Sequence, residues 1–367
     1  MTVPQPYRRF PRLMSWLEDD DVKAKYGIDT VYRMHANETP LGPSPRAIAA
    51  MAATAADLGT YPPMGDENVR AKLAEIWGQG LAADNFYLGC SGYEALELVT
   101  RAYLTPGDNV IVCPPTFGIY YKCAALEGAT VTDVPLKADF TVDVDAVLAA
   151  VTERTRLLIL CNPNNPTGNI ALDQAGMDRL VAEMPDHVII LSDEVYYHFV
   201  ENENYPNSVA YALAGKPVIL IHSFSKSYCL PGLRLGYAIA PVEIADYVAG
   251  VQRGFHLNKL ALVGAMAALE DQEHMKRNVA AAKSGRKWIA KQLEELGLDF
   301  VPSETNYLMV KLPKDPAVVS AELERQGILV RPQAGGPLDG YLRVSSTVPA
   351  GNEAFVSALA RILEDAS

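Results

Sequence analysis

The segment "HSFSKSYCLPGLRLGYAIA" (residues 222–240) contains a single lysine, Lys226, which lies between serines and between two apolar runs. The run before it is "PVILI" (217–221), and the run that closes the segment is "LGYAIA" (235–240). Burying an ammonium group is costly, so a lysine in this setting needs an explanation. Either Lys226 ends a strand and points into water, or its amine has a chemical role in a crevice.

The run before Lys226 is the last of four short, largely aliphatic runs that alternate with segments of helical character. These runs are "NVIVCPP" (109–115), "TRLLILCNP" (155–163), "HVIILSDE" (187–194) and "PVILIHSFS" (217–225). The segments between them include "GYEALELVTRAYL" (92–104) and "DQAGMDRLVAEM" (173–184). Parallel strands need such crossover connections, and strands that are apolar throughout are buried on both faces. The sequence therefore predicts an α/β fold with a mostly parallel sheet covered by helices.

The pattern changes after residue 255. A long helical region, residues 265–297, is followed by the strand-like segments "TNYLMVKL" (305–312), "GILVRP" (327–332) and "YLRVSS" (341–346). This order is typical of a smaller α+β domain with its own short sheet. We expect an N-terminal arm at 1–35 that packs on this smaller domain, a large domain at 36–255 and the smaller domain at 256–367.

Composition and charge exclude several classes of partner. The 367 residues are 49% hydrophobic and carry a net charge of −12, and no stretch concentrates lysine and arginine. A nucleic-acid partner is therefore not expected. No run approaches the roughly 20 apolar residues of a membrane span, and the first residues lack the apolar core of a secretion signal. These features predict a cytoplasmic protein without a membrane partner.

The cysteines and histidines do not form a metal-binding pattern. The five cysteines include no C-x-x-C pair, and the six histidines include no H-x-x-x-H pair. Reduced thiols fit this spacing better than a disulfide framework or a zinc site. We expect no metal site.

Four polar residues follow three of the predicted strands. Asn165 lies in "NPNNPTG", Asp193 and Tyr196 lie in "SDEVYY", and Lys226 lies in "SFSKSY". Taken singly, each has a structural explanation, since the first stretch is a good turn and the second could cap a helix. Ligands of open parallel sheets bind beyond the carboxyl ends of the strands, however. The four side chains are therefore predicted to face one crevice.

These residues belong to a series of motifs that occur in a fixed order along most of the chain. The motifs are "ANETPLGPSP" (36–45), "YPPMGDENVRAKLAE" (61–75), "PPTFGIYY" (114–121), "NPNNPTG" (162–168), "SDEVYYHF" (192–199), "FSKSYCLPGLRLGY" (224–237) and "YLRVSS" (341–346). The series resembles the pyridoxal-phosphate aminotransferases of the aspartate-aminotransferase fold. It is most similar to their histidinol-phosphate aminotransferase branch.

The resemblance implies a cofactor, pyridoxal phosphate, and a role for each residue around it. Lys226 would hold the cofactor covalently and later carry a proton, which would explain a lysine in a crevice. Asp193 would pair with the ring nitrogen and favour its protonated form. Tyr196 and Asn165 would donate hydrogen bonds to the phenolic oxygen, and Phe117 would stack on the ring.

The resemblance also implies a site for the cofactor's phosphate and a second subunit. The phosphate site would consist of Gly92, Tyr93, Ser223, Ser225 and Arg234. The family more often has an aspartate next to Glu94, where this chain has Tyr93, so any role of that aspartate is absent. Tyr61 matches a tyrosine that reaches the cofactor phosphate of the neighbouring subunit, which implies a homodimer.

The substrate-binding residues follow from the same resemblance. Arg343 matches the arginine that binds the substrate α-carboxylate, and Arg331 matches one that helps to hold a substrate phosphate. Asn37 and His256 complete the predicted substrate site, although His256 could also be an ordinary, partly exposed histidine. Tyr7 is a weak match for an N-terminal tyrosine of the branch.

Three activities stay open at this point. The first is transfer of an amino group from histidinol phosphate to 2-oxoglutarate. The second is transfer from another donor, such as an aromatic amino acid, to a 2-oxo acid. The third is a different reaction of the same cofactor, such as decarboxylation or oxidation, because a cofactor site alone does not choose the bond that breaks.

Overall fold

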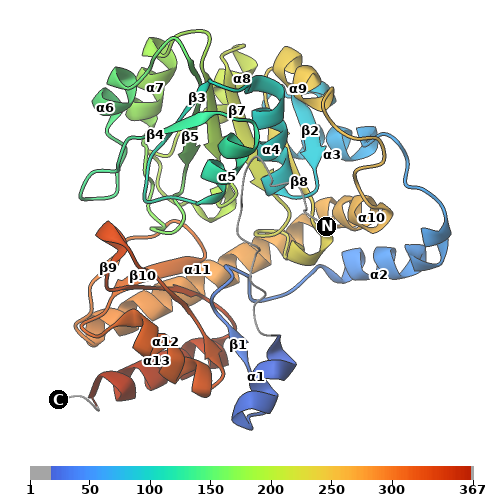
Figure 1. Cartoon of the computed structure of the whole chain (residues 1–367). Helices are drawn as coiled ribbons and strands as arrows, with labels where there is room; N and C mark the ends of the chain where they lie inside the picture. Colours follow the sequence, from blue (N-terminus) through green and yellow to red (C-terminus); the bar gives the residue numbers. More distant parts are fainter. Residues whose placement is uncertain (1–17, 365–367) are drawn as a thin grey trace, which may run out of the picture.

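A computed structural model describes residues 18–364 of the chain. Its largest element is a seven-stranded sheet in the order β2-β8-β7-β6-β5-β3-β4 (Figure 1). The strands are β2 (Phe86–Gly89), β3 (Asn109–Val112), β4 (Thr130–Asp133), β5 (Thr155–Cys161), β6 (Ile189–Asp193), β7 (Val218–Ser223) and β8 (Gly236–Ile239). Neighbours from β4 to β7 are parallel, whereas β8 runs antiparallel to both β7 and β2. The prediction of a mostly parallel sheet is confirmed.

Helices cover both faces of this sheet because its strands are apolar on both sides. On β7, Ile219 and Ile221 pack on one face while Val218 and Leu220 pack on the other. One face is covered by α4 (Gly92–Tyr103), α5 (Ile119–Leu126) and α9 (Val242–Ala249). The other is covered by α2 (Pro45–Thr54), α3 (Glu67–Trp77), α6 (Val144–Ala149), α7 (Gln174–Glu183), α8 (Ser208–Leu213) and α10 (Lys259–Leu269).

A smaller antiparallel sheet in the order β12-β13-β10-β9 follows in the C-terminal part of the chain. Its strands are β9 (Phe300–Val301), β10 (Tyr307–Lys311), β12 (Arg331–Pro332) and β13 (Tyr341–Ser345). Three helices pack with it, α11 (Gln272–Glu295), α12 (Pro316–Arg325) and α13 (Pro349–Glu364). The predicted α+β character of this part is confirmed, and the helical region divides where the Asp271 side chain caps α11.

The N-terminal segment joins the smaller sheet region. After α1 (Asp19–Tyr26), strand β1 (Tyr32–Arg33) pairs in parallel with β11 (Ile328–Leu329), and Met34 is buried in the core of the smaller unit. The exact domain boundaries stay a prediction, and residues 1–17 of the expected arm lie outside the described residues.

Short 3-10 helices complete the described chain: η1 (Ala55–Gly59), η2 (Ala83–Asn85), η3 (Tyr197–Phe199), η4 (Pro231–Leu233) and η5 (Gly336–Leu338). Within residues 18–364, no helix is both long enough and apolar enough to cross a membrane. The same part of the chain contains no cluster of three or more potential metal ligands from histidine, cysteine, aspartate and glutamate.

Candidate active site

A cavity of ≈690 Å³ lies beyond the carboxyl ends of β5, β6 and β7, where the smaller sheet faces the larger one. The position of the cavity follows from the sheet topology, because the loops that follow the parallel strands all begin at this edge. The lining residues that carry polar or aromatic side chains include Asn37, Tyr93, Phe117, Asn165, Asp193, Tyr196, Ser223, Ser225, Lys226, Arg234, Arg331, Gln333 and Arg343.

Lys226 lies in the turn that follows β7, and its side chain lines the cavity. Its Nζ donates to the main-chain oxygen of Asn37 at 3.0 Å and lies 5.7 Å from the centre of the Tyr196 ring. Burial, followed by the positive charge of Arg343, lowers the pKa of Lys226 to about 8. The amine is therefore easier to deprotonate than that of an ordinary lysine, as a nucleophile requires.

Asp193 ends β6 and is only 6% exposed. Tyr120, from α5, donates a hydrogen bond of 2.8 Å to Oδ2 of Asp193. Burial raises the pKa of Asp193 to about 6, although the hydrogen bond from Tyr120 acts in the opposite direction. A buried carboxylate facing a cavity is suited to a ligand that brings a positive charge.

Arg343 reaches the cavity from β13 of the smaller sheet. Its Nη1 donates to Oδ1 of Asn165 at 2.6 Å, and its Nη2 donates to the main-chain oxygen of His35 at 2.9 Å. The Nε atom is buried and has no hydrogen-bond partner among the described residues. Because a buried, unpartnered donor is costly, this position favours an anionic ligand.

The opposite end of the cavity is formed by the start of α4, where Gly92 exposes main-chain amides. A side chain at Gly236 would bring its Cβ within 2.1 Å of the Gly92 nitrogen, so only glycine lets β8 approach this helix start. Ser223, Ser225 and Arg234 line the same cavity. Amides at a helix start, hydroxyl groups and a guanidinium together suit a phosphate.

Arg331 lies directly opposite Arg343 in the β12–β13 pair and also lines the cavity. Within residues 18–364 its guanidinium makes no hydrogen bond or ion pair. Two guanidinium groups on adjacent strands repel each other unless an anion lies between them. This edge of the cavity therefore suits a ligand with one or two anionic groups.

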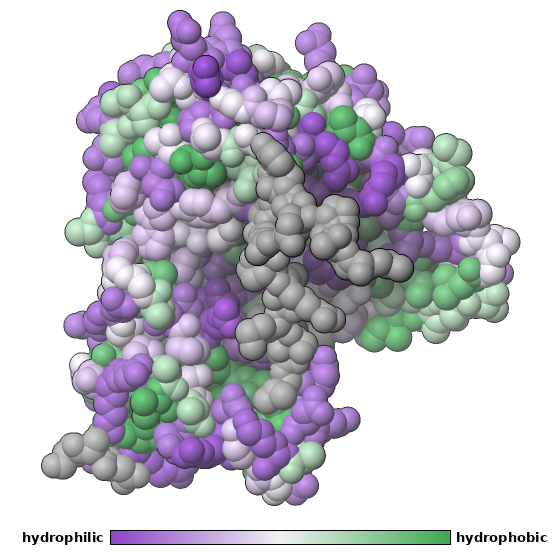
Figure 2. Space-filling view, viewed as in Figure 1, coloured by the Kyte–Doolittle hydropathy of each residue, from purple (hydrophilic) through white to green (hydrophobic). Residues whose placement is uncertain are grey.

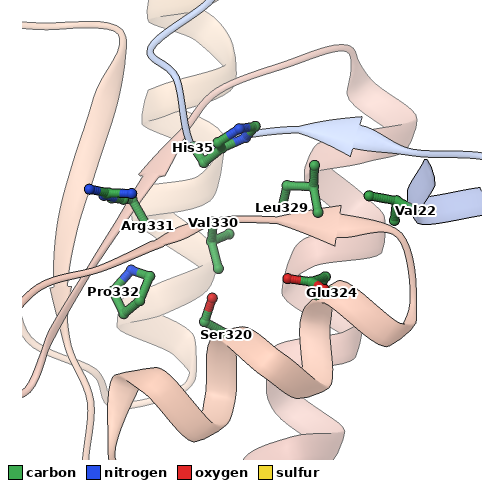
Figure 3. Close-up of a pocket in the computed structure, with 8 residues that line it drawn as sticks. All are labelled: Val22, His35, Ser320, Glu324, Leu329, Val330, Arg331 and Pro332. Atoms are coloured by element: carbon green, nitrogen blue, oxygen red, sulfur yellow. The ribbon is translucent and has the colours of Figure 1, made fainter. Parts of the chain in front are cut away.

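A second, smaller cavity of ≈230 Å³ lies behind Arg331, between the N-terminal segment and α12 (Figure 3). Its lining residues are Val22, His35, Ser320, Glu324, Leu329, Val330, Arg331 and Pro332. Burial lowers the pKa of His35 to about 4, so its imidazole is neutral near pH 7. Because Arg331 lines both cavities, its side chain forms part of the wall between them.

The family model for aminotransferase class I and II matches residues 29–362 of the chain. The chain belongs to this family. The matched region contains all the lining residues of the larger cavity, from Ala36 to Arg343. The expected resemblance is confirmed at the level of the family.

Relatives of this aminotransferase-family chain cover nearly all of its length. It is 37% identical over 345 residues to a histidinol-phosphate aminotransferase of Moorella thermoacetica, covering 94% of this chain and 88% of the relative. It is 35% identical over 333 residues to a histidinol-phosphate aminotransferase of Akkermansia muciniphila, covering 91% and 90%.

Solved structures show the same fold. The crystal structure of histidinol-phosphate aminotransferase from Sinorhizobium meliloti in complex with pyridoxal-5'-phosphate has a TM-score of 0.87 at 24% identity, covering 96% of each chain. A double mutant of Thermus thermophilus aspartate aminotransferase has a TM-score of 0.79 at 25% identity, covering 95% of this chain and 97% of that chain. The expected aspartate-aminotransferase fold is confirmed.

Two predicted site residues of this family member do not line the cavity of their own chain. Tyr61 is 79% exposed and stacks on Phe255 with ring centres 4.8 Å apart. His256 lies beside the main-chain oxygen of Leu88, at 3.4 Å, and lines a separate small cavity next to Met64. Tyr7 lies outside the described residues. All the other predicted residues line the larger cavity, and their individual roles stay predictions.

Sequence reasoning missed two residues next to Asp193. Tyr120 bonds to its carboxylate, and Cys161 lies opposite it in the β5–β6 pair and lines the cavity. The available signal was the spacing of three between Phe117 and Tyr120 in "PPTFGIYY", which places both side chains on one side of a helical turn. For Cys161, the signal was its place at the end of a buried strand.

Proposed function

We propose that this protein is a pyridoxal-phosphate-dependent aminotransferase whose amino donor is histidinol phosphate and whose acceptor is 2-oxoglutarate. The observation that carries the proposal is the meeting of three groups in one cavity: the Lys226 amine, the buried Asp193 carboxylate and the Arg343 guanidinium, whose Nε has no partner among the described residues. Membership of the aminotransferase class I and II family supports the reaction type. The names of the relatives support the donor.

The residues present fit pyridoxal phosphate. When bound, this cofactor supplies an aldehyde for an amine to attack and a ring that accepts electrons from the substrate Cα. Asp193 would hold the ring nitrogen in its protonated form, because an ionised carboxylate favours a nearby positive charge. The start of α4 at Gly92, with Ser223, Ser225 and Arg234, offers neutral and charged donors for the phosphate.

The ring would be oriented by three side chains. Tyr196 and Asn165 line the cavity with a phenol and an amide that can donate to the phenolic oxygen. Phe117, which is 40% exposed at the cavity wall, would stack on the ring face. Together these contacts fix the plane in which electrons from the substrate are accepted.

Lys226 would move the proton. With the cofactor and substrate bound, the Nζ of Lys226 would take the proton from the substrate Cα and would return it to the carbon of the cofactor. With a pKa of about 8, roughly a tenth of such amines are neutral at pH 7, far more than for an ordinary lysine. A pKa near the working pH also lets the same amine both remove a proton and give it back.

The two arginines would select the substrates. Arg343 would bind the anionic group nearest the reacting carbon, and Arg331 would bind an anionic group or the substrate's far end. A phosphate ester donor and a dicarboxylic 2-oxo acid both carry enough negative charge for this pair. A neutral substrate would leave the guanidinium groups of adjacent strands without a counterion.

We further propose a cytoplasmic homodimer in which Tyr61 reaches the cofactor phosphate of the neighbouring subunit. Several large apolar side chains are exposed on and near α2, where Figure 2 shows a hydrophobic surface: Leu41, Ile48, Leu58, Tyr61, Met64 and Phe255. A second copy of the chain would cover them. All five cysteines are unpaired, in keeping with a reducing compartment.

An amino-donor screen tests the proposal. Purified protein loaded with pyridoxal phosphate is incubated with 2-oxoglutarate and histidinol phosphate, histidine, the aromatic amino acids or aspartate, and glutamate formation is measured. We expect the highest kcat/KM for histidinol phosphate. A preference for an aromatic amino acid, or loss of carbon dioxide without glutamate formation, would contradict the proposed donor or reaction.

A further inference from the structure

The side chain of Asn37 contacts the phenol of Tyr196 at the wall of the cavity. Asn37 lies between β1 and α2, is 3% exposed, and donates from Nδ2 to the Tyr196 hydroxyl at 2.7 Å. Its main-chain oxygen accepts from Nζ of Lys226 at 3.0 Å. One residue from the N-terminal segment therefore contacts the reacting groups of both Tyr196 and Lys226.

Ser345 fixes the orientation of the Asn37 amide. The main-chain N–H of Asn37 donates to Oγ of Ser345, and the same hydroxyl donates to Oδ1 of Asn37, both at 3.1 Å. A serine hydroxyl has one hydrogen to give, and here it goes to Oδ1. Ser345 is fully buried, and Oδ1 of Asn37 is the only acceptor for its hydroxyl among the described residues. A flipped amide would leave that buried hydrogen without an acceptor, so Nδ2 faces Tyr196.

This arrangement leaves the proton of Tyr196 available. A phenol that accepts a hydrogen bond keeps its own O–H for another partner, and no acceptor for it is present among the described residues. Tyr196 lines the cavity, so its hydrogen is free to be donated to a bound ligand. A donor to an oxygen that alternates between neutral and anionic forms favours the anionic form.

We propose that Asn37 is a positioning residue that sets the direction of the Tyr196 hydrogen bond, so that Tyr196 always donates to the phenolic oxygen of the cofactor. This inference rests on the proposed function. It gives Asn37 a role beside the predicted contact with the substrate, which stays a prediction, because Nδ2 bonds to Tyr196 and Oδ1 bonds to Ser345.

Asn37→Asp reverses the hydrogen bond with almost no change in shape. A carboxylate only accepts, so Tyr196 would donate to residue 37 instead of to the cofactor. Asn37 has a φ of 54°, which aspartate tolerates almost as well as asparagine. Asn37→Gly is the second variant, because glycine adopts this conformation and removes the donor without adding charge.

The readout is the absorbance of the bound cofactor titrated against pH, which does not depend on turnover. We expect Asn37→Asp to raise the apparent pKa of this absorbance by about one unit, as Tyr196→Phe should, because each removes one hydrogen bond to the anionic form. The double variant Asn37→Asp/Tyr196→Phe should show no larger shift than Tyr196→Phe alone. Asn37→Gly should shift it in the same direction.

Thr39→Val is the matched control. Thr39 lies two residues away, and its hydroxyl donates to the main-chain oxygen of Lys226 at 3.1 Å without a contact to Tyr196. Its apparent pKa should equal that of the wild type. An unchanged pKa in both Asn37 variants, or shifts that add to that of Tyr196→Phe, would overturn the inference. A wild-type protein that takes up no cofactor would instead refute the proposed function.

Discussion

The hydroxyl of Tyr120 donates a hydrogen bond of 2.8 Å to Oδ2 of Asp193, and both side chains are buried. The bond stabilises the ionised carboxylate, whose pKa burial otherwise raises. The second carboxylate oxygen, Oδ1, accepts a long hydrogen bond of 3.4 Å from the main-chain N–H of Val195 and can accept a further one from a ligand in the cavity. Asp193 is therefore held in the charge state and orientation that a protonated ring nitrogen needs.

Tyr120→Phe should raise the pKa of Asp193 above about 6, because it removes a hydrogen bond to the charged form. The acidic limb of cofactor uptake by the apoprotein should then move to higher pH by about one unit. The measurement is cofactor affinity between pH 5 and 8. Tyr121→Phe is the matched control, since this neighbouring tyrosine donates to Asp133 at the surface. Equal profiles for the two variants would refute the role of Tyr120.

Asp193→Asn should retain the fold and bind cofactor but lower kcat by at least about 100-fold. Without a carboxylate, the ring nitrogen loses the partner that favours its protonated form. The negative charge that develops from the substrate in the transition state then loses several kcal/mol of stabilisation. The measurement is kcat of the variant and of the wild type from steady-state kinetics at saturating cofactor. Unchanged kcat would show that Asp193 is not the partner of the ring nitrogen.

Arg343→Ala and Arg331→Ala should differ in selectivity. Loss of Arg343 should lower kcat/KM for every donor, whereas loss of Arg331 should weaken phosphorylated and dicarboxylic substrates by about 2 kcal/mol and spare neutral donors. The comparison uses histidinol phosphate, glutamate and a neutral amino acid on each variant. If Arg331→Ala weakened neutral and anionic donors equally, Arg331 would not bind the distal anion.

Glu194→Gln should stabilise the apoprotein at neutral pH but not at acidic pH. Glu194 is 2% exposed, and burial raises its pKa from 4.5 to about 7. Its neutral form is favoured in the folded state, so the stability it contributes is complete below pH 4.5 and is lost as pH rises towards 7. Relative to wild type, the unfolding free energy of the variant should increase by up to roughly 3 kcal/mol across this range.

Urea unfolding at pH 5 and pH 8 measures this difference. Glu203→Gln, at an exposed position of the following loop, is the matched control and should differ little from wild type at either pH. A gain in stability that is the same at both pH values would mean that Glu194 does not change its protonation between them.

The central sheet and the strand-end residues could be predicted because both depend on local sequence. The runs of β5, β6 and β7 are apolar throughout, and Asn165, Asp193 and Lys226 follow them directly. The direction of β8 could not be predicted, because the run "LGYAIA" is equally apolar in a parallel or an antiparallel strand.

The contacts of Asn37 could not be predicted either. Its side chain bonds to Tyr196, 159 positions away, and to Ser345, 308 positions away. No periodicity connects such distant residues, and their meeting depends on how the smaller sheet faces the larger one. Motif matching identified Asn37 as a residue of the substrate site, which stays a prediction, but gave no sign of these two contacts.

The central claim is that Lys226 holds the cofactor in an aminotransferase site. Protein loaded with pyridoxal phosphate is reduced with borohydride, which fixes the cofactor on the amine that holds it, and the modified peptide is identified by mass spectrometry. We expect one modified lysine per chain, Lys226, and no modification in the same peptide of Lys226→Ala. Modification of a different lysine as the main product, or a wild-type protein that remains unmodified, would contradict the account.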